Sequence, residues 1–132
     1  MTVIAFISQK GGVGKSTLAQ ALASEANKKK ISVLLADCDS QQSTSYEWSK
    51  LNKKIPCQVF NSVKEVWPLS KDYDLIIIDG PARTSTGTLE TAKKSNLIIQ
   101  PTGASRADLI PAVKEFHALV KAGINKKNFY SF

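Results

Sequence analysis

The sequence predicts an α/β fold with three layers, a mostly parallel sheet carrying helices on both faces. Short apolar runs rich in β-branched residues alternate with segments of helical periodicity along all 132 residues. Strands that are apolar at nearly every position are buried on both faces, which is typical of parallel sheets. In addition, a glycine-rich loop directly follows the first apolar run and precedes a helix. The length suits one domain, covering residues 1–132.

Five strands and the start of a sixth are expected from the apolar runs. The segment DLIIID is the strongest of them, and NLIIQP is ended by its proline. The last residues, FYSF, resemble the beginning of another strand. The expected ranges are 3–7, 31–37, 57–60, 74–79, 96–101 and 129–132.

Helices are expected between these strands. In the first, Leu18, Ala21, Leu22 and Ala26 fall on one face. The third is short and is expected to stop at Pro68. The last should be capped by Ser105, with Asp108 three residues on, and closed by Gly123. The expected ranges are 16–29, 43–52, 62–67, 89–94 and 107–121.

Composition excludes some classes of protein and leaves one question open. With 42% hydrophobic and 22% charged residues, the chain matches an ordinary soluble domain, and no apolar run approaches a membrane span. Cys38 and Cys57 have no metal or redox spacing and are expected to be free thiols in a reducing cytoplasm. The net charge of +7 fits either solvated helix ends or a surface that binds polyanions.

The loop SQKGGVGKST departs from the usual phosphate-binding pattern G-x-x-x-x-G-K-[ST]. Gly14, Lys15 and Ser16 fit the end of that pattern, but Gln9 stands where its first glycine belongs, and Lys10 follows. Small residues should let the backbone curl so that successive N–H groups point at one anion. The expected phosphate-binding set therefore begins with Gly11, Gly12, Val13 and Gly14.

Side chains complete the expected site. Lys15 should place its charge on the terminal phosphates of a nucleotide, and the Ser16 hydroxyl should bind Mg²⁺. Thr17 is placed to hydrogen-bond a phosphate nearer the base. Asp79 ends the strongest strand and fits the acidic residue that holds Mg²⁺, through water. Ligands of parallel sheets bind beyond the carboxyl ends of the strands, so these loops should form one site.

Four segments together resemble the ParA/MinD group of P-loop ATPases. KGGVGKST resembles the group's deviant phosphate loop, and ISVLLADCDSQQS resembles its second motif. DYDLIIIDGPA and NLIIQPTGAS resemble its third motif and fourth strand. The resemblance covers nearly the whole chain and is greatest to short plasmid-type partition ATPases. It implies a P-loop NTPase-type fold, of which this chain is expected to lack the final strands and helices.

The resemblance also implies roles for three further residues. Lys10 matches the signature lysine that reaches across an ATP-dependent homodimer to the partner's phosphates, and it is therefore a catalytic candidate with Lys15. Asp39 matches the residue that positions the attacking water. Asp37 is expected to hold the waters around magnesium, or the loop itself.

The function implied is a weak, partner-stimulated Mg²⁺-dependent ATPase that partitions DNA. The ATP-bound dimer would bind DNA non-specifically, and a ParB-like centromere-binding partner would stimulate hydrolysis. The protein would be cytoplasmic, associated with the nucleoid when ATP is bound, and not membrane-bound. An alternative is a truncated nucleotide-binding or dimerisation module with little turnover. Two related classes are not expected. A cell-division positioner would need an amphipathic membrane helix, which FYSF is not, and a nitrogenase iron-protein type would need cluster cysteines after the third motif, where the sequence has none.

Overall fold

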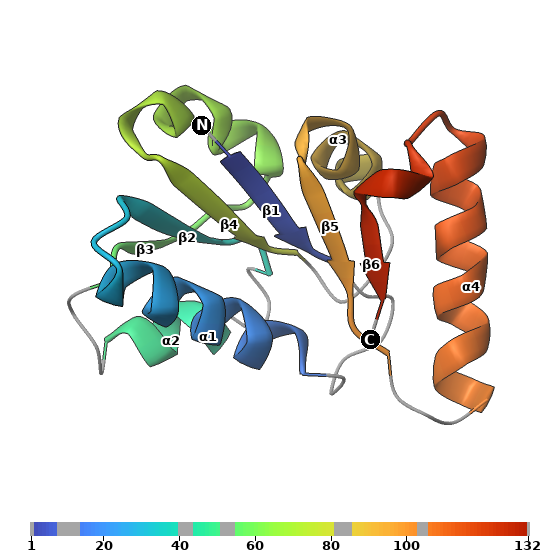
Figure 1. The fold of residues 1–132 in the computed structure, drawn as a ribbon, viewed down its shortest axis with the longest axis horizontal. Helices are drawn as coiled ribbons and strands as arrows, with labels where there is room; N and C mark the ends of the chain where they lie inside the picture. Colours follow the sequence, from blue (N-terminus) through green and yellow to red (C-terminus); the bar gives the residue numbers. More distant parts are fainter. Residues whose placement is uncertain are drawn as a thin grey trace.

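The computed structural model describes residues 2–7, 14–39, 44–50, 55–80, 86–102 and 106–131. Within them lies a six-stranded sheet of order β3-β2-β4-β1-β5-β6, in which every neighbouring pair is parallel. This confirms the predicted α/β fold with a parallel sheet (Figure 1). The strands are β1 Thr2–Phe6, β2 Val33–Asp37, β3 Cys57–Val59, β4 Leu75–Asp79, β5 Leu97–Gln100 and β6 Phe129–Ser131.

Helices and 3₁₀ turns cover both faces of the sheet. One face packs against α1 (Lys15–Lys28) and α2 (Thr44–Ser49), which lie together in Figure 1. The other packs against the 3₁₀ turns η1 (Val63–Glu65) and η2 (Trp67–Asp72), α3 (Thr86–Lys94) and α4 (Arg106–Lys121). A third 3₁₀ turn, η3, spans Lys126–Asn128. The layers are therefore helix, sheet and helix.

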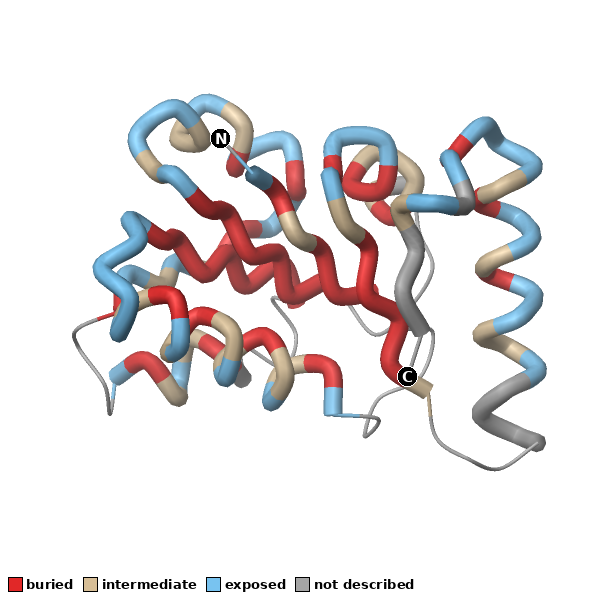
Figure 2. Tube along the Cα trace, viewed as in Figure 1, coloured by how far each residue is buried: buried red, intermediate tan, exposed pale blue. Residues whose placement is uncertain are grey.

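The central strand β4 shows why its sequence forms a buried parallel strand. Its residues alternate between the two faces: Leu75 and Ile77 join the core under α1, while Ile76 and Ile78 join the core under η1 and α3. All four are buried; β2 on one side is buried throughout, and β1 on the other is buried except for the exposed Thr2 and the half-buried Ile4 (Figure 2). A strand covered on both faces needs apolar residues at successive positions, which is the pattern LIII.

Two of the predicted helices differ from the structure. The expected helix at 62–67 is wrong, because this stretch forms two 3₁₀ turns that continue through Pro68 to Asp72. Pro68 lies in the first turn of η2, where its missing N–H is not needed, so it does not stop the chain. The helix expected at 89–94 begins earlier, at Thr86.

The ends of the helices agree with the prediction only in part. Gly123 follows α4 with a φ of 104°, the left-handed conformation typical of a residue that closes a helix. The predicted cap Ser105, the end of the predicted helix at 51–52 and the last residue of FYSF lie outside the described residues.

The sheet brings the carboxyl ends of three strands together. Asp79 of β4 is paired in register with Phe6 of β1 on one side and with Asp37 of β2 on the other. The segments that follow β1, β2 and β4 therefore leave the same edge of the sheet, where ligands of parallel α/β proteins bind.

The two-sided burial of β4 predicts a large effect of truncating its side chains. Ile77→Ala should lower the free energy of unfolding by about 2–5 kcal/mol, because Ile77 is fully buried and a cavity would remain. Ile31→Ala is the matched control, since Ile31 is 41% exposed, and should cost less than about 1 kcal/mol. Urea denaturation measures both values, and equal losses would contradict this account of the core.

Candidate functional site

Helix α1 begins directly after Gly14. Gly14 has a φ of 86°, in the left-handed region that favours glycine, and its carbonyl accepts the hydrogen bond of the Leu18 N–H at 2.9 Å. Lys15 is the first residue of α1. The turn thus directs the start of α1, and with it Lys15, toward the edge of the sheet.

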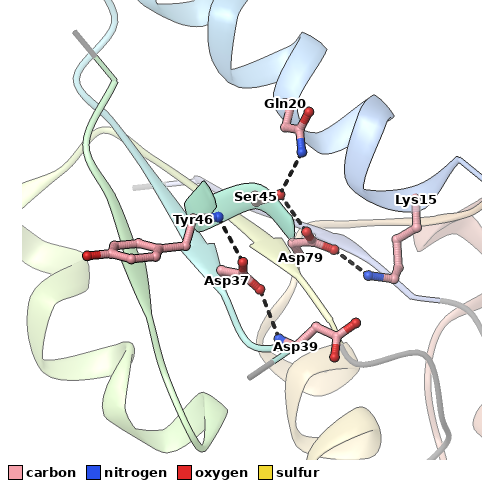
Figure 3. A network of polar contacts seen from close by, with 7 residues as sticks. All are labelled: Lys15, Gln20, Asp37, Asp39, Ser45, Tyr46 and Asp79. Carbon is pink, nitrogen blue, oxygen red and sulfur yellow. Dashed lines mark hydrogen bonds and ion pairs between the residues drawn. The ribbon is translucent and has the colours of Figure 1, made fainter. Parts of the chain in front are cut away.

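Lys15 and Asp79 form a buried ion pair at this edge. The ammonium group of Lys15 contacts Oδ1 of Asp79, and the two side chains are 6% and 0% exposed (Figure 3). Lysine and aspartate are seldom buried unless they are paired, because removing a charge from water is costly. The pair therefore places one positive and one negative group at the carboxyl end of β4.

The second oxygen of Asp79 is also engaged. The Ser45 hydroxyl, in the first turn of α2, donates to Oδ2 of Asp79 at 2.6 Å. The side-chain amide of Gln20, on α1, donates to the Ser45 oxygen at 3.3 Å. Figure 3 shows the resulting chain from α1 through α2 to the end of β4. Both helices on this face of the sheet are thus connected to one carboxylate.

Asp37, next to Asp79 in the sheet, holds the loop between β2 and α2. Its Oδ1 accepts from the Asp39 N–H at 3.1 Å, and its Oδ2 accepts from the Tyr46 N–H at 2.9 Å. Burial raises the pKa of the Asp37 carboxyl, with a further contribution from the charge of Asp79; the two N–H donors and Lys15 oppose this shift. Asp37 thereby connects Asp39, directly after β2, with Tyr46 in the first turn of α2.

Backbone hydrogen bonds align the strand ends around the site. The Cys38 N–H donates to the Asp79 carbonyl at 2.9 Å, and the Gly80 N–H donates to the Phe6 carbonyl at 3.0 Å. A Cβ atom at position 80 would approach that same carbonyl oxygen to 3.0 Å, so any side chain there would press the two strand ends slightly apart. The three strand ends are therefore held in fixed relation.

The structure brings several of the predicted site residues to one edge of the sheet. Lys15, Asp37, Asp39 and Asp79 are buried there. Ser16 is half-buried and Thr17 is exposed at the start of α1. Lys10, Gly11, Gly12 and Val13 lie outside the described residues.

Three contributors were missed by the sequence analysis: Ser45, Gln20 and Gly80. The segment QQSTS contains several hydroxyl residues, and nothing in it indicates which of them faces Asp79. Gln20 belongs to a helix whose pattern marks only its apolar face. Gly80 could have been found, because a glycine directly after a buried strand often permits a close backbone approach.

The oxygen ligands at this edge of the sheet suit a magnesium ion that is also bound by phosphate oxygens. Mg²⁺ usually takes one or two carboxylates together with phosphate oxygens and waters, and not a cage made only of protein groups. The described residues contain no group of three or more acidic, histidine or cysteine side chains able to hold a metal by themselves. The Asp79 carboxylate and the hydroxyl of Ser16, the residue after Lys15, are the protein groups expected to contact such an ion.

The two cysteine thiols are free and poorly ionised. Burial raises the pKa of Cys38 to about 12, and the charges of Asp37 and Asp79 add to the shift. Burial likewise raises the pKa of Cys57 to about 12, against the hydrogen bond with Ser49. Neither thiol is a candidate nucleophile at neutral pH.

A left-handed glycine, a lysine at the start of a helix and an aspartate at the end of the central strand are the described features that the sequence analysis expected of a phosphate-loop nucleotide site. A model of the AAA_31 family, described as an AAA domain, matches residues 1–120, and the chain belongs to that family. It fits the ParA/MinD group, whose members are P-loop ATPases.

One relative is similar in sequence. The maintenance of carboxysome distribution protein A of Gloeobacter kilaueensis is 30% identical over 128 residues, which cover 89% of this chain. This chain spans only 56% of the length of that protein.

Two crystal structures of plasmid partition proteins from Borrelia burgdorferi share the fold. One has a TM-score of 0.73 and 21% identity, with 99% of this chain and 77% of that chain covered. The other, bound to AMPPNP, has a TM-score of 0.71 and 22% identity, with 98% of this chain and 72% of that chain covered.

In the described part of the present chain, no helix has the length and apolar character needed to cross a membrane.

The raised thiol pKa values predict slow alkylation of the folded protein. At pH 8, iodoacetamide should modify Cys57 and Cys38 at least about a hundredfold more slowly than in the urea-unfolded chain, because the thiolate is the reacting form. Mass spectrometry of timed samples measures the rates, and equal rates in both states would contradict the burial.

The raised pKa values of the two thiols also affect stability. The free energy of unfolding should fall as the pH rises above about 9, because only the unfolded thiols ionise there.

Proposed function

We propose that this chain binds Mg²⁺-ATP and hydrolyses it as a partition-type ATPase. The observation that carries the proposal is the buried pair of Lys15 and Asp79 at the carboxyl end of β4. A lysine held at the start of a helix, beside a carboxylate, is placed to exchange that carboxylate for phosphate oxygens. Its binding to the terminal phosphates would leave Asp79 free for the ion that accompanies them.

Each nearby group has a role in this proposal. Bound Mg²⁺ would neutralise charge on the phosphates, with the Ser16 hydroxyl and Asp79 as its protein contacts. Gly11, Gly12, Val13 and Gly14 would supply backbone N–H groups to the phosphates, and Thr17 would bind one nearer the base. Asp39 would orient the attacking water through its carboxylate. Asp37 would hold the waters around Mg²⁺ or the segment that carries Asp39, and its bond to the Asp39 N–H supports the second role.

A homodimer would complete the catalytic site. Lys10 would reach the phosphates bound by a second copy and stabilise the charge that develops during transfer, as an arginine finger does. Hydrolysis would then depend on pairing of two ATP-bound chains.

The biological role proposed is DNA partition in the cytoplasm. The ATP-bound dimer would bind DNA phosphates non-specifically on the nucleoid, supported by the net charge of +7. A ParB-like protein would stimulate ATP hydrolysis and release the dimer. Support for this role comes from the likeness to plasmid partition proteins, together with the family assignment.

Removal of the Lys15 charge should weaken ATP binding. Lys15→Ala should raise the dissociation constant of Mg²⁺-ATP about a hundredfold, because a charge-assisted contact to phosphate is lost. Calorimetry measures this, with Lys28→Ala as the control, since Lys28 is exposed in the last turn of the same helix. Equal affinity of Lys15→Ala and the wild type would show that ATP does not bind through this loop.

Asp39→Ala should bind ATP normally and fail to hydrolyse it. The reason is that Asp39 would act on the water and not on the phosphates. Phosphate release measures turnover, and Asp74→Ala, an exposed aspartate just before β4, is the control. Normal turnover by Asp39→Ala would leave Asp39 with a structural role only.

Lys10→Ala should remain a folded, nucleotide-binding monomer that has lost pairing and hydrolysis. Sedimentation with a non-hydrolysable ATP analogue compares it with the wild type and with Lys29→Ala, which changes an exposed lysine after α1. Equal pairing of all three proteins would exclude Lys10 as the bridging residue. A wild type that stays monomeric would favour the alternative, a nucleotide-binding module with little turnover.

A further inference from the structure

We propose that Ser45 is a positioning residue that orients the Asp79 carboxylate and thereby sets the magnesium affinity of the nucleotide site. The inference rests on the proposed binding of Mg²⁺-ATP and adds a residue to it. Ser45 lies in the first turn of α2, is 0% exposed and does not belong to the phosphate loop. Its role follows from the direction of one hydroxyl proton.

The Ser45 proton has to point at Asp79. A hydroxyl has a single proton and an ionised carboxylate can only accept, so the 2.6 Å contact with Oδ2 uses that proton. The oxygen of Ser45 is then free to accept, and the Gln20 amide donates to it at 3.3 Å. Gln20 therefore holds the hydroxyl in the orientation that bonds Asp79.

This bond leaves one particular carboxylate oxygen for the metal. In the structure, Oδ1 of Asp79 contacts Lys15 and Oδ2 contacts Ser45. When Lys15 turns to a phosphate, Oδ1 becomes available, while the bond to Ser45 still prevents the carboxylate from rotating. Ser45 thus presents Oδ1 to the position that Lys15 has left.

The position of Ser45 is itself fixed from a second strand. The next residue, Tyr46, donates its N–H to Asp37 at 2.9 Å, and Asp37 is paired in register with Asp79. The first turn of α2 is therefore held by the ends of two neighbouring strands. A hydroxyl held in this way loses little freedom on binding, so its bond is available to orient the carboxylate.

The experiment is ATP binding by the whole 132-residue chain, measured by calorimetry in EDTA and over a series of Mg²⁺ concentrations. For each protein, the measured quantity is the Mg²⁺ concentration that produces half of the full change in ATP affinity. For Ser45→Ala this concentration should be about tenfold higher than for the wild type, as is typical when a partner of a metal-binding carboxylate is removed. Its affinity for ATP in EDTA should stay within about twofold of the wild type, which a general loss of structure would not allow.

Ser49→Ala is the matched control. Ser49 lies on the same helix and is 8% exposed, and its hydroxyl donates its one proton to the Tyr46 carbonyl at 2.7 Å, so that proton is not available to either aspartate. It should leave the Mg²⁺ dependence unchanged. An unchanged curve for Ser45→Ala, or an equal shift for both variants, overturns the proposal.

A second variant decides the question if Ser45→Ala does not fold. Gln20→Ala keeps a good helix former on α1 and removes only the donor to Ser45. It should shift the Mg²⁺ requirement by at least about twofold, and an unchanged requirement overturns the proposal. Should the ATP affinity of the wild type not respond to Mg²⁺ at all, the proposed function fails, and the role of Ser45 fails with it.

Discussion

Burial of the Asp79 carboxylate constrains the elements around it. A carboxylate at the end of a central strand, with no exposure to solvent, needs partners for both of its oxygens. Lys15 supplies one from the start of α1, and Ser45 supplies the other from the start of α2. The two helices on this face are therefore positioned by the same group that is proposed to contact magnesium.

A second carboxylate, that of Asp37, fixes the position of the first turn of α2 through backbone N–H groups and not through Lys15. Asp37 accepts the N–H groups of Asp39 and Tyr46, so the segment after β2 leaves the sheet and returns to α2 at fixed points. The loop that carries Asp39 is thus tied to the strand ends at both sides.

The sequence predicted local structure best where its residue types favour one kind of element or one kind of site. Apolar, β-branched runs such as LIIID are typical of strands covered on both faces, and they predicted a parallel sheet. The G-K-S segment and the aspartate that ends β4 predicted the pair of Lys15 and Asp79 as parts of one site. The predicted helix at 62–67 was wrong, because Pro68 suits the first turn of a 3₁₀ helix as well as a helix end. Ser45 was missed, because only the fold shows which hydroxyl after β2 faces Asp79.

We propose that, when nucleotide binds, the Lys15 ammonium moves from Asp79 to a phosphate while the Ser45 hydroxyl keeps its bond to Asp79. A crystal structure of the chain with AMPPNP and Mg²⁺ tests it most directly. We expect the Lys15 ammonium to lie on a phosphate oxygen and Oδ1 of Asp79 to face the metal or its waters, with the Ser45 hydroxyl still bonded to Oδ2. A structure in which nucleotide is bound while Lys15 remains paired with Asp79 would contradict it.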